Sequence, residues 1–349
     1  MIRLLKDVAS AVENLHPAYF ALVMATGIVA IAAHFEGLAT IALGLTWFNA
    51  AAFCVLWIMY LLRLVLYPRS FVRDMADFER GPGFFTLVAG TGVFGSQAII
   101  IFGNNQLAFV LWVLSVPLWA CLIYTIFAAF TVKENKPSLE GINGGWLIAV
   151  VATQAVSNLG TLLSPRFAEQ QRNILFFTFS MWLFGGMLYI WLIALIFYRY
   201  TFFHFSPADL MPPYWINMGA MAISTLAGTT LIESSPHAPF LPEVLPFLKG
   251  FTVFYWATAT WWIPMLLILG FWRHVYKKFK LIYSPLYWGA VFPLGMYAAS
   301  THRLSDVLNM PALFWVQRIF VYVALVAWLA TFLGLVKAVG NFAKLRAPH

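Results

Sequence analysis

Residues 17–34 read PAYFALVMATGIVAIAAH, an apolar stretch without Asp, Glu, Lys or Arg. A helix of this length and hydrophobicity can cross the hydrocarbon core of a bilayer. Nine further apolar stretches follow, separated by polar residues, prolines or glycines. The predicted membrane spans are 17–34, 41–66, 82–102, 106–131, 144–163, 173–198, 212–232, 247–271, 283–301 and 311–336.

The composition of the whole chain agrees with these spans. Of the 349 residues, 62% are hydrophobic and 10% are charged, whereas about 25% of the residues of a soluble protein are charged. The spans leave no room for a soluble domain. We therefore expect an all-α polytopic membrane protein in which residues 1–349 form a single transmembrane channel or transporter domain.

The distribution of basic residues predicts the orientation. With the N-terminus in the cytoplasm, sixteen of the 21 Lys and Arg residues fall in cytoplasmic segments, among them Arg3, Lys6, Lys344 and Arg346. Basic residues collect on the cytoplasmic side of membrane proteins. The sequence thus predicts both termini in the cytoplasm, and the net charge of +8 is interpreted as orientation rather than as affinity for nucleic acid.

Small residues alternate between successive spans. Windows of eighteen residues that begin at Pro17, Pro82, Gly144, Pro213 and Pro285 contain eight, nine, nine, nine and seven Gly, Ala, Ser or Thr. Windows in the five spans between them, starting at 45, 109, 174, 251 and 311, contain four, three, four, five and three. Small side chains let helix backbones approach closely. We expect five helical hairpins, with the odd helices in an inner ring around a pore and the even helices in an outer ring.

The inner spans also share a motif. Four of them open with proline followed by an aromatic pair, as in Pro17-Ala18-Tyr19-Phe20, and proline in the first helical turn costs no hydrogen bond. No acidic or basic residue lies between their ends, which predicts a neutral pore lined by hydroxyls, amides and glycines. The candidate lining residues are Thr26, Gly27, Thr91, Gly92, Thr153, Gln154, Ser157, Ser224, Thr225 and Gly295. Hydrogen bonds between helices are an equal alternative for each of the polar ones.

Three motifs resemble a known family: HPAYFALVMATGIVA at 16–30, the stretch 82–95, and Trp288-Gly289-Ala290-Val291-Phe292-Pro293 followed by Ser300-Thr301. The chain is similar to the tellurite-resistance and C4-dicarboxylate transporter family, which includes the slow-type anion channels of plant guard cells. The resemblance implies ten helices, a homotrimer with one pore in each protomer, and a gate at Phe292 and Pro293, where the phenylalanine occludes the pore. It also implies the inner membrane of a bacterium.

Three functions are compatible with these residues. The uncharged inner ring and Phe292 favour a gated, passive pathway for small inorganic or organic anions. The family also suggests a C4-dicarboxylate carrier for malate or succinate, coupled to protons, and a route for tellurite or another oxyanion. A dicarboxylate calls for cationic partners, which the inner spans lack.

Titratable residues gather at the predicted outer ends of the inner spans: His34, Glu233, His302 and Arg303. They are candidates for an outer vestibule that attracts anions, and solvated loops are the alternative. The sequence contains no HExxH, GxSxG or Cys/His metal spacing. The string Gly90 to Gly95 matches a dinucleotide fingerprint but lies inside an apolar span. We therefore predict no cofactor, no metal and no enzymatic activity.

Overall fold

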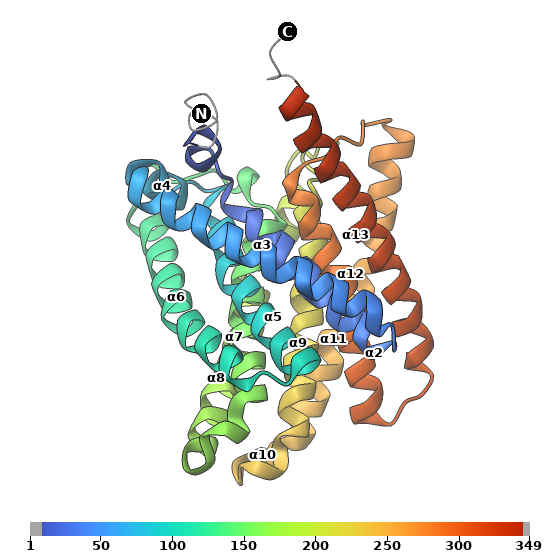
Figure 1. Cartoon of the computed structure of the whole chain (residues 1–349). Coiled ribbons are helices and arrows are strands. Elements are labelled where there is room, and N and C mark those ends of the chain that lie inside the picture. The colour runs from blue at the N-terminus through green and yellow to red at the C-terminus, as the bar shows by residue number, and fades with distance from the viewer. Residues whose placement is uncertain (1–8, 345–349) are drawn as a thin grey trace.

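The computed structural model describes the backbone of residues 9–344 and the side chains of residues 9–340. Arg3, Lys6 and Arg346, which support the predicted orientation, lie outside the described backbone, and the Lys344 side chain lies outside the described side chains. The described chain is all helical and contains no strand, as the sequence predicts. Each of the ten predicted segments contains one long helix (Figure 1).

Five of these helices are mostly buried, and each follows a short 3-10 turn that opens at or next to the predicted proline or glycine. The pairs are η1 (Pro17–Phe20) with α2 (Ala21–Phe35), η2 (Gly81–Phe84) with α5 (Phe85–Phe102), η4 (Gly144–Leu147) with α7 (Ile148–Leu163), η6 (Pro212–Trp215) with α9 (Ile216–Glu233), and η9 (Pro285–Tyr287) with α12 (Trp288–Leu308).

The other five long helices are α3 (Ala39–Leu66), α6 (Asn105–Val132), α8 (Gln171–Phe202), α11 (Leu245–Phe271) and α13 (Leu313–Lys344). Shorter elements connect them: α4 (Pro68–Met75), η3 (Leu139–Gly141), η5 (Ser164–Gln170), η7 (Ser235–His237), α10 (Phe240–Glu243) and η8, a π-helical turn at Trp272–Tyr276.

The buried helices form a closed ring. Helix α2 packs on α5, α5 on α7, α7 on α9, α9 on α12, and α12 returns to α2. Their 3-10 turns contact one another in the same cyclic order, so the five helices are parallel and begin at one end, which we call the proline end. Small residues permit this packing, since a Cβ placed on Gly219 of α9 would lie 2.7 Å from Pro293 Cγ of α12.

The remaining long helices lie outside this ring (Figure 1). In four of them 17 to 33% of the most apolar stretch is buried, against 83 to 94% in α2, α5 and α9. Each outer helix packs on the inner helix of its own hairpin and also contacts the next inner helix around the ring. At least one side-chain hydrogen bond is present in each of these second contacts, for example Asn49 to Gln97, Trp119 to Thr153, Trp182 to the carbonyl of Ser224, Trp256 to Thr301, and Trp328 to Thr26.

Three buried arginines tie the outer helices to the proline end. Arg63 near the end of α3 donates to the carbonyl of Glu13, and Arg199 of α8 to that of Glu140. Arg273, which follows α11, donates to the carbonyl of Leu210. Each acceptor lies shortly before the inner helix of the same hairpin. These hydrogen bonds connect the outer helices to the chain segments that precede the inner helices at the proline end.

Candidate functional site

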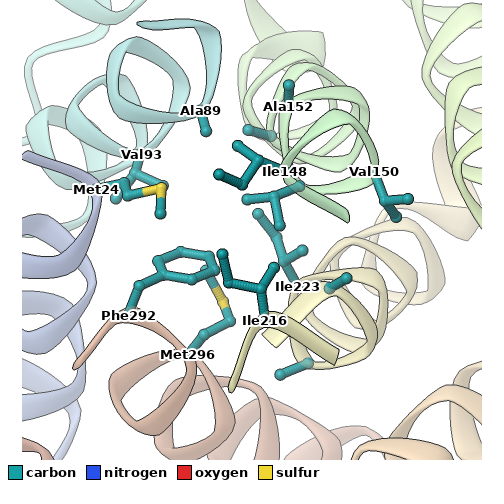
Figure 2. Packing of buried hydrophobic residues seen from close by; sticks show 14 of the residues in the cluster. Met24, Ala89, Val93, Ile148, Val150, Ala152, Ile216, Ile223, Phe292 and Met296 are labelled. Carbon is teal, nitrogen blue, oxygen red and sulfur yellow. The ribbon is translucent and has the colours of Figure 1, made fainter. Parts of the chain in front are cut away.

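Phe292 lies on the axis of the inner ring. Its side chain is fully buried and points towards the middle of the ring, which apolar side chains of the other inner helices also face, among them Met24, Val93, Ile148 and Ile216 (Figure 2). These neighbours are all apolar. We call this apolar level of the inner ring the constriction.

A cavity of about 260 Å³ opens on the proline-end side of Phe292. Every inner hairpin contributes to its lining, which includes His16, Arg80, Asn143, Ile148, Ile216 and Gly289. We call it the axial cavity. Ile148 and Ile216 belong both to its wall and to the apolar cluster around Phe292, so the cavity ends where the constriction begins.

A second cavity of about 10 Å³ lies on the other side of the constriction, enough for about one water molecule. Ser96 of α5 and Asn158 of α7 line it, together with Met296 and other residues of all five inner helices. Asn158 Nδ2 donates to Ser96 Oγ over 3.2 Å, and Thr230 Oγ1 of α9 donates to Asn158 Oδ1 over 2.8 Å. This belt supplies polar groups next to the axis beyond Phe292.

The residues that face the axis recur at fixed distances along the five hairpins. Counted from Pro17, Pro82, Gly144, Pro212 and Pro285, the residues eleven positions later are Ile28, Val93, Ala155, Ile223 and Met296, and all five line the small cavity. The residues one position later are Ala18, Gly83, Gly145, Pro213 and Leu286, and all five line the axial cavity. The axis is thus built by one repeated helix face.

The structure does not place the predicted polar lining residues on this face. Thr26 and Thr153 accept hydrogen bonds from outer-helix tryptophans, while Gln154 and Ser157 donate to carbonyls of α8. Thr91 bonds to its own helix and lies two residues, or about 200°, from the axis residue Val93. The polar groups of these five residues thus form hydrogen bonds within the helical scaffold.

The other predicted lining residues lie partly in contacts between or within helices and partly at the small cavity. Ser224 and Thr225 donate to carbonyls one turn earlier in α9, and neither borders a cavity on the axis. Gly27 and Gly295 lie in helix contacts, since a Cβ at Gly295 would lie 2.9 Å from Val29 Cγ2 of α2. Gly92 does line the small cavity. Pro293 packs on α9 beside Phe292.

Three of the four predicted vestibule residues lie together at the end opposite the proline end. Arg303 forms an ion pair with Glu233 at 3.2 Å, and its guanidinium lies over the Phe35 ring. His302 stacks on the same ring with centroids 4.7 Å apart. His34 is exposed beside Phe35. His302 and Arg303 lie in α12, which runs to Leu308, beyond the predicted limit of 301.

Residues 14–336 match the family model described as voltage-dependent anion channel, SLAC1. The chain belongs to this family. The match covers the whole inner ring and confirms the family resemblance inferred from the motifs at 16–30, 82–95 and 288–293. The chain is accordingly a multi-pass membrane protein of an anion-transporting family.

Some relatives align with nearly the whole chain and others with part of it. An uncharacterized transporter of Methanocaldococcus jannaschii is 28% identical over 330 residues, which are 91% of this chain and 94% of the relative. An uncharacterized membrane protein of Mycobacterium tuberculosis is 36% identical over 148 residues, 42% of this chain and 75% of the relative. A sulfite efflux pump of Trichophyton rubrum is 22% identical over 345 residues, 92% of this chain and 90% of the relative.

Proposed function

We propose that this protein is a gated, passive pathway for small anions, and that Phe292 closes it. The observation that carries the proposal is the position of this buried side chain on the axis of the ring, between a cavity on each side. Hydrophobic constrictions gate channels by excluding water. An ion that enters a dry apolar segment loses hydration worth several kcal/mol, so the constriction is closed to ions while the phenyl ring stays in place.

The membrane arrangement belongs to the same proposal. Eight helical stretches are long and apolar enough to cross a bilayer, and one of them, residues 144–202, contains both α7 and α8. Counting these two separately and adding α12 gives ten crossings. We place the proline end, with both chain termini, on the cytoplasmic side of a bacterial inner membrane because of the positive-inside asymmetry, and we expect a homotrimer with one pore in each protomer.

The proposed substrate is a small monovalent anion. On the side of Phe292 away from the proline end, the small cavity is lined by the amide of Asn158 and the hydroxyl of Ser96 and, among the described residues, by no charged group. Such neutral groups bind an ion weakly enough to release it. Hydrogen sulfite is a specific candidate, because fungal sulfite efflux pumps align over nearly the whole chain. The dicarboxylate and tellurite alternatives find no comparable support, since the small cavity holds no group to pair with a second negative charge.

The test is nitrate flux into proteoliposomes. Phe292→Ala should raise the flux at least about tenfold, which corresponds to a barrier lowered by about 1.4 kcal/mol. Phe94→Ala is the matched control, because Phe94 is also buried in an inner helix but stacks on Phe53 of α3, with ring centroids 4.7 Å apart. Equal fluxes from wild type and a folded Phe292→Ala protein would refute the gate. The same liposomes loaded with sulfite, succinate or tellurite rank the substrates.

A further inference from the structure

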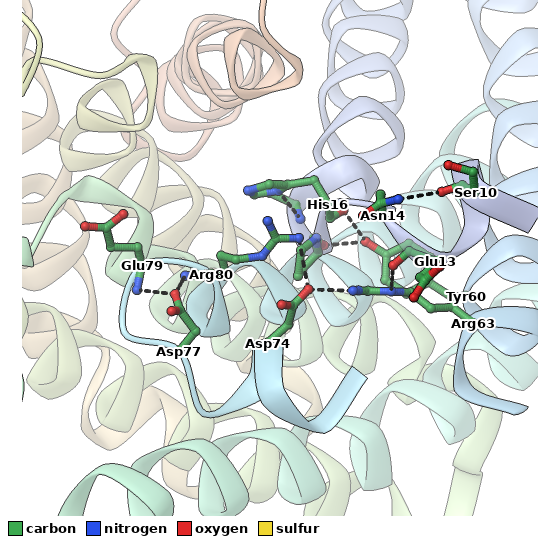
Figure 3. A network of polar contacts seen from close by, with 12 residues as sticks. Ser10, Glu13, Asn14, His16, Tyr60, Arg63, Asp74, Asp77, Glu79 and Arg80 are labelled. Atoms are coloured by element: carbon green, nitrogen blue, oxygen red, sulfur yellow. Dashed lines mark hydrogen bonds and ion pairs between the residues drawn. The ribbon is translucent and has the colours of Figure 1, made fainter. Parts of the chain in front are cut away.

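The axial cavity combines an arginine with a neutral hydrogen-bond donor at the mouth of the pathway. Arg80 lies just before η2, and 36% of its side chain is exposed. Its Nη2 is 2.9 Å from Asp74 Oδ2, which also accepts from Arg63 Nη2 at 2.6 Å (Figure 3). One carboxylate is thus shared by two guanidinium groups. The three groups together carry a net charge of +1, which is the uncompensated charge.

The Arg80 guanidinium has a hydrogen-bond donor without an acceptor. Its Nε is buried without a hydrogen-bond partner among the described residues. A buried donor without an acceptor is costly, and an anion in the axial cavity could supply one. Glu79 is the acidic residue in the cavity lining; it is exposed at the rim and forms no ion pair with Arg80 in the described chain.

His16 contributes the neutral donor. Its Nδ1 accepts a hydrogen bond from the backbone N–H of Ala18 at 3.1 Å, so the proton of the neutral ring is on Nε2. Burial, and then the charge of Arg80, lower the pKa of His16 to about 4. The ring is therefore uncharged near neutral pH. It lines the same cavity as Arg80, and Figure 3 shows the two side chains next to each other.

We propose that the axial cavity is a binding site for one small monovalent anion, which the Arg80 guanidinium attracts and the Nε2–H of His16 holds. The inference rests on the proposed function, since the ion would occupy this cavity before it passes Phe292. A single uncompensated charge matches a monovalent ion. A volume of about 260 Å³ accommodates nitrate, chloride or hydrogen sulfite with part of its hydration.

Conductance in the Phe292→Ala background tests the role of Arg80. Arg80→Gln should lower unitary nitrate conductance at least about threefold in about 0.01 M salt, and little in about 1 M salt, where charges are screened within about 3 Å. Arg80→Lys should retain most of the conductance, and Glu79→Gln should raise it at low salt. Arg69→Gln, which removes an exposed charge on α4, is the matched control and should change nothing.

Binding can be measured without opening the gate. In detergent, nitrate should raise the melting temperature of the wild type more than an equal ionic strength of sulfate does, and Arg80→Gln should abolish the difference. No nitrate-specific shift, an equal conductance loss at both salt concentrations, or an equal effect of Arg69→Gln would overturn the site. Nitrate stabilisation without current from Phe292→Ala would keep the site and reject the proposed function instead.

Discussion

Replacement of Asn158 by leucine tests whether the polar belt beyond Phe292 assists permeation. Asn158 uses one N–H for Ser96 and its carbonyl oxygen for Thr230, which leaves the second N–H for an ion on the axis. A hydrogen bond to a charged group contributes about 1.5–3 kcal/mol. Since about 1.4 kcal/mol corresponds to a factor of ten, Asn158→Leu should lower conductance roughly tenfold to hundredfold.

The assay is unitary nitrate conductance in planar bilayers, with Phe292→Ala as the parent. Gln154→Leu is the matched control, because Gln154 is a buried amide one turn earlier on α7 whose Nε2 donates to the Trp182 carbonyl of α8. It should alter stability but keep the parental conductance. If Asn158→Leu conducts within about twofold of the parent, or if both variants lose conductance alike, the polar belt has no role in permeation.

Two further predictions concern the proline end. The folded-state pKa of His16 is about 4, against an ordinary value of 6.5. Between these two pH values the unfolded chain binds a proton that the folded chain does not. The free energy of unfolding should therefore decrease as the pH is lowered through this window. Asn at position 16 can still cap the helix, so His16→Asn should flatten the decline of melting temperature from about pH 7 to about pH 4.5; an unchanged slope would contradict this. Arg63→Leu removes one partner of the buried Asp74 and should lower the free energy of unfolding by about 3 kcal/mol, measured by denaturant unfolding in detergent. The control Arg69→Leu should lower it little. Equal losses in the two variants would exclude the buried pair as the cause.

The helices and their two layers could be predicted from the sequence because both follow from local composition. Apolar stretches bounded by prolines and charges define the helix limits to within a few residues, except in α8, α12 and α13, where one or both ends extend further. The excess of small residues identifies the inner helices, since only they must pack on neighbours on several sides. Neither signal reports the rotation of a helix about its own axis.

That rotation decides which residues of an inner helix face the axis. Thr26 and Thr153 stand at equal distances from the start of their hairpins, which suggests a shared role, and they do share one: each accepts a tryptophan N–H from an outer helix. The partner of Thr26 is Trp328, 302 residues away, so no local pattern reveals the contact. Ser96 and Asn158 were missed although both lie fourteen residues after Pro82 and Gly144, a regularity that identifies the axis face.

The reversal potential of the Phe292→Ala protein in planar bilayers tests the central claim most directly. With a tenfold gradient of potassium nitrate, an anion pathway should reverse close to the nitrate equilibrium potential, about 59 mV at 25 °C for a monovalent ion, with a unitary current that the wild type and Phe94→Ala lack. A current that reverses near the potassium potential, or no current from a correctly folded Phe292→Ala protein, would contradict an anion pathway closed by this side chain.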